Sequence, residues 1–203
     1  MKVIGLCGGS GSGKGLVCSI FSELSVPSID TDALYREMTE KDSPCLRALR
    51  AEFGDEIISK DGSLNRSALR NIVFLSEKSE LKRKKLNLIS HKFILNEVRF
   101  IIEKNRKQGV SAVLVDAPLL YESGFDRECD LTVCVIADEE IRLKRIMERD
   151  GISKSDALAR IRGQISNEML INISDHVIEN NGDIEKLRRL VTDFYENNIK
   201  NEV

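Results

Sequence analysis

The chain has 203 residues, of which 41% are hydrophobic and 32% are charged, and its formal net charge is −2. A chain of this length can bury a sizeable core, and the near balance of charge excludes binding to nucleic acid through a strongly basic surface. No apolar run approaches membrane-spanning length and no signal segment is recognisable at the start, so we expect a cytoplasmic protein without membrane or nucleic-acid partners.

The composition favours an α/β fold over an all-β fold, because tryptophan is absent and aromatic residues make up only 5%. The cysteines are odd in number and form no Cys-x-x-Cys pair, which predicts free thiols rather than a disulfide framework or a zinc site. They are Cys7, Cys18, Cys45, Cys129 and Cys134.

The first predicted strand, Lys2–Cys7, is followed by the glycine-rich segment Gly8–Lys14 and by a helical pattern over Leu16–Phe21. Strand, glycine loop, lysine and helix in this order are typical of a phosphate loop that binds a nucleotide. Glycines let backbone N–H groups converge on one anion, and the helix start adds positive charge. The candidate nucleotide-binding residues are Gly9, Ser10, Gly11, Ser12, Gly13, Lys14, Gly15 and Leu16.

This phosphate loop lacks one element of its pattern. The pattern G-x-x-x-x-G-K-[ST] ends on a hydroxyl that ligates Mg²⁺, but this chain has Gly15 and Leu16 after the lysine. We therefore expect the departure to affect metal binding more than nucleotide binding.

The second predicted strand, Val26–Asp30, ends on two carboxylates, Asp30 and Asp32. At the carboxyl edge of a sheet, one could accept a proton from an attacking hydroxyl while the other orients it or holds magnesium through water. The alternative, which applies to Asp30 more than to Asp32, is a cap on the helix that begins near Ala33.

The stretch from Thr31 to Gln108 is too long for a single crossover, and its clearest helical patterns are Leu64–Phe74 and Leu81–Lys107. We expect a helical insertion over residues 33–108, above the sheet edge where ligands bind. Within it, the basic run Lys82–Lys85 is more typical of a solvated face, whereas His91 could contact a substrate.

The third predicted strand, Val110–Asp116, ends in Asp116, which resembles the magnesium-holding strand end of phosphate-loop enzymes. A carboxylate that caps a turn is the alternative. The following segment, Ala117–Gly124, would form a loop across the sheet edge in which Pro118 restrains the backbone.

The fourth predicted strand, Asp130–Ala137, leads into a helix whose start is marked by charge and capping at Asp138. Arg142, Arg145 and Arg149 follow at spacings of three and four, on one helical face, which suits neutralisation of a transferring phosphoryl group. The alternative is a solvated face paired with acidic neighbours.

A capping box, Ser153–Asp156, predicts a new short helix inside residues 149–167, whose polar character suits a mobile lid. Arg160 and Gln164 are weaker phosphate-binding candidates in that lid. A fifth strand, His176–Asn180, and a final packing helix from Gly182 complete the chain.

Taken together, these elements predict a P-loop kinase-like α/β fold, with a doubly wound five-stranded parallel sheet and helices on both faces. The helical insertion and the lid would belong to one domain that spans residues 1–203.

An ordered set of segments resembles the dephospho-CoA kinase family from Ile4 to about Val191. Besides the phosphate loop, the segments that carry the resemblance are Asp30–Asp32 with Arg36, Leu64–Phe74, Leu86–His91, Asp116–Gly124, Arg149–Asp150, Arg160–Gln164 and Asp175–Asn180. The Asp116–Gly124 segment is the most distinctive, whereas the phosphate loop alone would indicate only a P-loop kinase.

The resemblance implies phosphoryl transfer from ATP to the ribose 3′-hydroxyl of dephospho-CoA, which gives ADP and CoA and is the last step of CoA synthesis. It implies that Asp32 orients or deprotonates this hydroxyl, that Lys14 and Gly11–Gly13 hold the β- and γ-phosphates, and that Arg142 and Arg149 neutralise charge. Mg²⁺ would lie among ATP, Asp116 or Asp32, and water.

The acceptor site and the adenine contact also follow only from the resemblance. Asn180 and the residues after it would contact the adenine of ATP, and the protein would be a monomer or a weak homo-oligomer. The residues that would bind dephospho-CoA are Asp32, Arg36, Arg66, His91, Leu119 and Glu122.

The chain departs from the family pattern at several positions. It has Gly15 and Leu16 where the family usually has Ser-Thr, Cys7 where it has threonine, and Arg142 where it has glutamine. Lys92 replaces the proline after His91. Two other functions remain open: a P-loop kinase for another nucleoside-like metabolite, and a nucleotide-binding module without catalysis.

Overall fold

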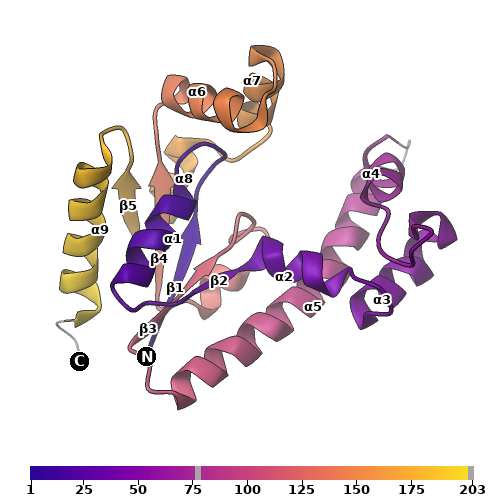
Figure 1. Ribbon diagram of the computed structural model, residues 1–203, viewed down its shortest axis with the longest axis horizontal. Helices are drawn as coiled ribbons and strands as arrows, with labels where there is room; N and C mark the ends of the chain where they lie inside the picture. Colours follow the sequence, from indigo (N-terminus) through magenta and orange to yellow (C-terminus); the bar gives the residue numbers. More distant parts are fainter. Residues whose placement is uncertain (76–78, 201–203) are drawn as a thin grey trace. The chain divides into compact units, whose positions relative to one another are not determined.

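The computed structural model describes residues 1–75 and 79–200. The chain divides into two compact units (Figure 1). The first contains Met1–Ile29 and Ile102–Val203, and the second contains Asp30–Ile101.

The first unit is built on a five-stranded sheet with the order β2-β3-β1-β4-β5. Its strands are β1 (Lys2–Cys7), β2 (Ser28–Asp30), β3 (Ala112–Asp116), β4 (Leu131–Ile136) and β5 (His176–Glu179). β1 pairs in parallel with both β3 and β4, and β4 pairs in parallel with β5. All five predicted strands are present and the predicted α/β fold is confirmed. The loop after the central strand β1 therefore emerges where the chain reverses its direction of winding, the place at which such sheets bind ligands.

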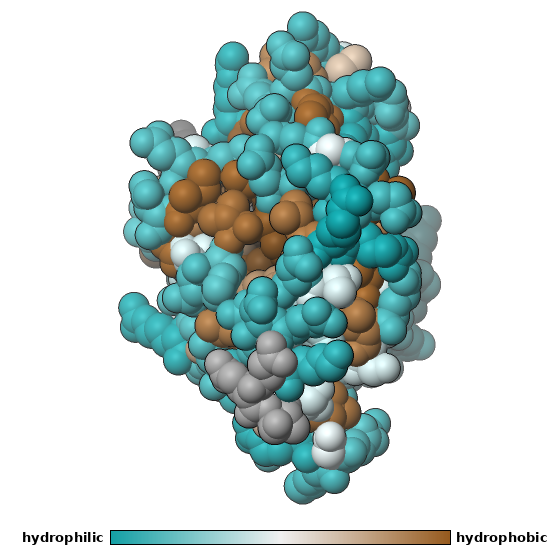
Figure 2. Space-filling view, turned by 90° about the vertical axis from the view of Figure 1, so that its left-hand side faces the viewer, coloured by the Kyte–Doolittle hydropathy of each residue, from teal (hydrophilic) through white to brown (hydrophobic). Residues whose placement is uncertain are grey.

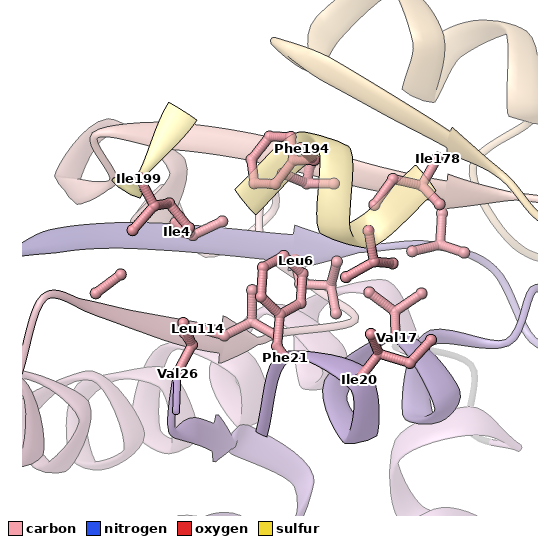
Figure 3. Packing of buried hydrophobic residues seen from close by; sticks show 14 of the residues in the cluster. Ile4, Leu6, Val17, Ile20, Phe21, Val26, Leu114, Ile178, Phe194 and Ile199 are labelled. Atoms are coloured by element: carbon pink, nitrogen blue, oxygen red, sulfur yellow. The ribbon is translucent and has the colours of Figure 1, made fainter. Parts of the chain in front are cut away.

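Two helices, α1 (Lys14–Glu23) and α9 (Ile184–Asn198), pack against one face of this sheet (Figures 1 and 3). Their buried residues recur at helical spacing, as in Val17, Ile20 and Phe21 of α1. The rings of Phe21 and Phe194 meet edge to face, with 6.0 Å between their centroids. This contact joins the two helices over Leu6 and the neighbouring strands.

The opposite face of β1 is covered by the segment that follows β3. A Cβ atom on Gly5 would lie 2.8 Å from the Sγ of Cys129 and 2.9 Å from Leu120, so only glycine fits there. Leu120 and Phe125, which begins the short helix η2 (Phe125–Glu128), are fully buried. Burial of these apolar side chains anchors the loop whose carboxyl-edge residues the sequence predicts to bind substrate.

The predicted lid contains α7 (Lys154–Arg162), which packs on α6 (Glu139–Asp150) through Ile146, Ala157 and Ile161. The predicted helix start is confirmed, because the Ser153 hydroxyl accepts a hydrogen bond from the Asp156 N–H at 3.2 Å. The Asp156 carboxylate accepts from the same hydroxyl at 2.6 Å. A further helix, α8 (Asn167–Ile173), then leads into β5.

The second unit contains α2 (Thr31–Met38), α3 (Pro44–Phe53), η1 (Asp55–Ile57), α4 (Arg66–Phe74) and most of α5 (Ser79–Lys107). Side chains cap its helices, since Asp30, Ser43 and Asn65 accept from the N–H groups of Ala33, Leu46 and Ala68. It has its own apolar core, and the two helices predicted over 64–74 and 81–107 are present. The buried members of that core are Cys45, Leu46, Leu49, Phe53, Ile57, Leu64, Leu69 and Val73.

The face drawn in Figure 2 is mostly hydrophilic, with one large group of apolar residues at its upper left and smaller groups elsewhere. No helix within the described ranges is both long enough and apolar enough to cross a bilayer. The cysteines at all five positions are free thiols, as predicted. Burial raises the pKa of the Cys7 thiol to about 11, so this thiol is protonated and unreactive at neutral pH.

Candidate active site

The glycine-rich segment forms a loop between the end of β1 at Cys7 and the start of α1 at Lys14. Gly13 has φ of 98°, in the left-handed region, and a Cβ there would lie 2.2 Å from the side-chain nitrogen of Asn180. A Cβ on Gly9 would lie 2.3 Å from a guanidinium nitrogen of Arg142. Glycine is therefore favoured at Gly13 by both its backbone conformation and the close approach of Asn180, whereas a Cβ at Gly9 would displace the Arg142 guanidinium.

Side chains from outside the loop hold its carbonyl groups. The Arg142 Nε donates to the Ser10 carbonyl at 2.9 Å, and the Asn180 Nδ2 donates to the Ser12 carbonyl at 2.8 Å. The Nη1 of Arg145 lies within 3.4 Å of both the Gly11 and the Ser12 carbonyls. These contacts hold the backbone of the loop in one conformation, the kind of preorganisation that electrostatic stabilisation requires.

Lys14 lies at the beginning of α1, and its Nζ is 3.6 Å from the Oδ1 of Asp116 at the end of β3. Both side chains are mostly buried, at 16% and 19% exposed. Cys18, one turn further along α1, donates its thiol proton to the other oxygen of Asp116 at 3.7 Å. The structure thus brings the predicted phosphate-binding lysine and the predicted metal-binding carboxylate together at the edge of the sheet.

The fit of a magnesium ion can be tested on these residues. Gly15 is exposed and a Cβ there would have nothing within 4 Å, so the position supplies no oxygen but has room for one. Within the described ranges, no group of three or more His, Cys, Asp or Glu side chains could hold a metal ion by itself. Mg²⁺ is ordinarily held by one or two carboxylates together with substrate phosphates and water. Asp116 fits that mode of binding.

The three predicted arginines do not share one environment. Arg142 is only 3% exposed, and its guanidinium contacts Ser10 and also the Gln164 and Asn167 side-chain oxygens, at 3.1 and 3.3 Å. Burial lowers the pKa of this guanidinium, but its ordinary value is high enough for the charge to remain. A solvated helix face is thus the wrong interpretation for Arg142.

Arg149, in contrast, forms a bidentate ion pair with the carboxylate of Asp150. Its Nε and Nη2 lie 2.7 and 2.9 Å from the two carboxylate oxygens. Arg160 of α7 pairs with the same carboxylate. The hydrogen bond from Arg149, with the contribution of Arg160, lowers the pKa of Asp150 to about 2. Asp150 therefore ties the end of α6 to the lid, and Arg149 is not joined to the loop as Arg142 is.

The expectation that Asp138 caps α6 is wrong. Its side chain makes no capping hydrogen bond, and its carboxylate instead accepts from the Nδ2 of Asn181 at 2.9 Å. The Asp138 N–H in turn donates to the Asn181 Oδ1 at 2.8 Å. A distant amide that satisfies both groups has replaced the local cap.

The loop after β3 exposes the predicted substrate-binding residues Leu119 and Glu122. Between them, Leu120 is buried and the hydroxyl of Tyr121 lies 2.6 Å from the hydroxyl of Ser174. The loop is anchored by one residue pair and presents the other to solvent.

The remaining predicted residues belong to the second unit. Asp30 is the N-cap of α2, as the alternative interpretation predicted, with its carboxylate 2.9 Å from the Ala33 N–H. Asp32 lies in the first turn of α2, exposed, and its backbone carbonyl accepts from the Nε of Arg36 at 3.2 Å. The two carboxylates thus have different surroundings, and only Asp30 is committed to capping.

Arg66, the first residue of α4, donates from Nη2 to the Thr39 hydroxyl at 3.2 Å. His91 lies within α5, half-buried, and burial lowers its pKa, which favours the neutral imidazole at pH 7. Their predicted contacts with an acceptor stay predictions.

No role was predicted for Asn167, whereas Arg145 was predicted to neutralise phosphate charge and Gln164 to be a weaker phosphate-binding candidate. Asn167 connects the Arg142 guanidinium to the Ala137 carbonyl, which accepts from its Nδ2 at 2.9 Å. The available signal was spacing, since Arg145 lies one turn from Arg142 on the same helical face. Nothing in the local pattern indicates Asn167.

The comparisons with known proteins agree on a single family. The chain matches the family model described as "Dephospho-CoA kinase" over residues 2–186. It is 40% identical over 182 residues to a dephospho-CoA kinase of Bacillus cereus, covering 90% of each chain. It is 37% identical over 201 residues to that of Listeria monocytogenes, covering 99% of each chain.

Among solved structures, the Thermus thermophilus protein TT1252 superposes with a TM-score of 0.80 at 29% identity, covering 97% of each chain. Both the sequence match and the fold extend over nearly the whole chain, which a shared phosphate loop alone would not produce. The chain belongs to the dephospho-CoA kinase family.

Proposed function

We propose that this protein transfers the γ-phosphoryl group of ATP to the ribose 3′-hydroxyl of dephospho-CoA, which releases ADP and CoA. The observation that carries the proposal is the approach of Lys14 to Asp116, at 3.6 Å, beside a phosphate loop whose carbonyls are already held. Such an arrangement would provide fixed donors for the charge that develops on a transferring phosphoryl group. The family membership supports the choice of acceptor.

The phosphates of ATP would be bound by the N–H groups of Gly11–Gly13 and by Lys14. Arg142 would add positive charge next to the loop, since its guanidinium contacts the Ser10 carbonyl at 2.9 Å. Arg149 would do so from the end of α6 once its ion pair with Asp150 loosens. An adenine contact by Asn180 stays a prediction. The side-chain nitrogen of this residue already donates to the Ser12 carbonyl.

Asp32 is the candidate for the group that orients or deprotonates the acceptor hydroxyl. In the described part of the chain, its carboxylate has no hydrogen-bond or ion-pair partner that would compete for the proton. Asp30 cannot take this role without giving up its cap on α2. A general base of this kind contributes about 10²- to 10⁴-fold to a rate.

Mg²⁺, when bound, would neutralise charge on the phosphates of ATP. Asp116 is the carboxylate of the first unit that would hold it, and Asp32 is the candidate in the second. Gly15 contributes no oxygen, so water and phosphate oxygens would complete the coordination shell.

The unit Asp30–Ile101 would bind the acceptor through Arg36, Arg66 and His91. Leu119 and Glu122, in the loop after β3, stay predicted acceptor-binding residues. Residues 149–167 would form the lid. The missing hydroxyl at position 15 favours one alternative function, that of a module that binds nucleotide and transfers no phosphoryl group.

The test is ADP release by the purified protein with ATP, Mg²⁺ and dephospho-CoA, with the product identified by mass. We expect ADP release that depends on the acceptor and a product heavier by one phosphoryl group. Nucleosides and nucleotides offered in competition would reveal a kinase for another metabolite. Binding of ATP without turnover on any acceptor, at high Mg²⁺ or Mn²⁺, would establish the non-catalytic module instead.

A further inference from the structure

The side chain of Gln164 joins the lid to the phosphate loop. Its Oε1 accepts one hydrogen bond from the backbone N–H of Ser10, at 2.9 Å, and a second from the Nη2 of Arg142, at 3.1 Å. Gln164 lies between α7 and α8, which are labelled in Figure 1. Its side-chain oxygen therefore connects the lid to a loop 154 positions away in the chain.

The two groups that donate to this oxygen could equally bind one oxygen of an anion. One is a backbone N–H of the phosphate loop and the other is a guanidinium, the two kinds of group that recognise phosphate oxygens in proteins. An amide oxygen accepts hydrogen bonds in the same way as a phosphate oxygen but carries no net charge. A phosphate oxygen in this position would gain more, because charge-assisted hydrogen bonds are roughly twice as strong as neutral ones.

The surroundings of Arg142 support the same conclusion. Its guanidinium is 3% exposed and donates to the Ser10 carbonyl, the Gln164 oxygen and the Asn167 oxygen, all of which are neutral. Over the described ranges no carboxylate forms an ion pair with it. A buried charge is ordinarily matched by an opposite one in direct contact. Glu139 acts on this guanidinium only through a longer-range charge interaction, which is smaller than the effect of burial, so its charge is incompletely compensated.

The side chain of Gln164 can move away from these donors, because this residue is exposed to solvent. Around the preceding Gly163, the only atoms within 4 Å of a Cβ would be backbone oxygens of α7. Arg142, in contrast, is fixed by Ser10 and Asn167 and would stay with the loop when Gln164 departs.

We propose that Gln164 is a positioning residue that competes with nucleotide phosphate: its side-chain oxygen occupies the Ser10 N–H and the Arg142 guanidinium until a phosphate oxygen displaces it and releases the lid. This inference rests on the proposed binding of nucleotide phosphates by the loop. It does not depend on which acceptor is phosphorylated.

The test is calorimetric titration of the whole protein with ADP, without acceptor, and with inorganic tripolyphosphate as a probe that lacks the nucleoside. In Gln164→Ala the competing oxygen is gone, and we expect Kd to fall by about 3- to 10-fold for both probes. In Gln164→Glu the competitor is a carboxylate that pairs with Arg142, and we expect Kd to rise by about 10-fold or more. A purely structural role would weaken binding in both variants.

Asn172→Asp is the matched control for charge, because Asn172 lies exposed on α8 and gains one carboxylate in the same part of the chain. We expect less than about a twofold change in Kd from this control, since a solvated charge is strongly screened. A second readout is deuterium exchange over residues 151–166, which should rise with ADP in the original protein and be already high in Gln164→Ala.

Weaker or unchanged binding of ADP and tripolyphosphate by Gln164→Ala, with an unchanged melting temperature, would overturn the inference and make Gln164 a support of the loop. An equal effect of Gln164→Glu and Asn172→Asp would do the same. If the Kd values shift as expected but dephospho-CoA is not phosphorylated, the competition stands and the proposed acceptor falls.

Discussion

The Nδ2 of Asn180, directly after β5, donates to the backbone carbonyl of Ser12 at 2.8 Å, across 168 positions of the chain. Asn180 and Ser12 are 4% and 1% exposed, so neither group can turn to water instead. The phosphate loop is therefore held by a residue that follows β5, the strand at one edge of the sheet.

Asn180→Ala should leave the Ser12 carbonyl buried without this donor. The carbonyl would keep only the 3.4 Å contact from the Arg145 Nη1, and loss of a hydrogen bond costs about 1 kcal/mol, so we expect a lower melting temperature and roughly fivefold weaker ATP binding. Calorimetric titration with ATP and thermal unfolding measure the two effects. Asn172→Ala, an exposed amide on α8, should change neither. Normal ATP affinity in Asn180→Ala would show that the loop holds its shape without this bond.

The glycines on either side of Lys14, Gly13 at the end of the loop and Gly15 in α1, should respond oppositely to alanine. Gly13→Ala puts a Cβ on a residue with φ of 98°, 2.2 Å from the Asn180 nitrogen, and should cost at least about 1–3 kcal/mol of unfolding free energy. Gly15→Ala places its Cβ in open space within α1 and should be neutral or stabilising by up to about 1 kcal/mol. Urea unfolding of both variants provides the comparison. Equal destabilisation by both would contradict the described loop geometry.

Gly15→Ser restores the hydroxyl that the phosphate-loop pattern expects. Since the position has room for a side chain, we expect normal folding and a lower Mg²⁺ concentration at half-maximal rate. The measurement is initial rate against free Mg²⁺ at saturating ATP and dephospho-CoA. Gly15→Ala fills the same space without an oxygen and should keep the original requirement. The same Mg²⁺ curve for serine and alanine would count against a water in place of the missing hydroxyl.

Asp32→Asn and Asp30→Asn separate chemistry from capping. We expect the first to lower turnover by about 10²-fold or more while ATP affinity stays normal, because the proposed proton acceptor is lost. Asparagine is itself a good N-cap, so Asp30→Asn should change turnover and stability little, whereas Asp30→Ala should cost about 1 kcal/mol of unfolding free energy. Steady-state kinetics and urea unfolding distinguish the two effects. Near-normal turnover of Asp32→Asn would rule out its proposed role.

The half-buried imidazole of His91 should make stability depend on pH. Burial lowers its pKa below the ordinary 6.5, so as pH falls through that value the unfolded chain binds a proton that the folded chain resists. The free energy of unfolding should therefore be greatest above pH 6.5 and decline toward pH 5.5. Urea unfolding across this range measures the decline, and His91→Gln should make it shallower. Identical slopes for both proteins would show that other groups cause the dependence.

Local patterns were sufficient for the elements and for much of the site. Continuous apolar runs predicted all five strands, since strands buried on both faces need apolar side chains at every position. The glycine spacing predicted the phosphate loop, and the side chain–backbone spacing of Ser153 and Asp156 predicted the start of α7. Each of these signals lies within a few residues, because strand burial, turns and caps are short-range properties.

The hydrogen-bond and ion-pair partners of these side chains were not predictable in the same way. Aspartate is a residue type typical of helix N-caps, yet the carboxylate of Asp138 accepts a hydrogen bond from Asn181, 43 positions later. The arginine spacing on α6 correctly indicated a shared face, but it could not tell that Arg142 is buried against the loop while Arg149 pairs with Asp150. A helix pattern specifies which residues are neighbours along the helix and leaves open what packs against them.

The order of the strands along the chain, the phosphate loop and the absence of a hydroxyl at Gly15 can all be read from the amino-acid sequence, because each depends on residues adjacent in the chain. The supports of that loop depend on the fold: Arg142, Gln164 and Asn180 reach it across 132, 154 and 168 positions. Contacts at such separations exist only after the parallel sheet has brought the ends of β1, β4 and β5 to one edge. Hydrogen-bond geometry, which acts over about 3 Å, then selects the partners.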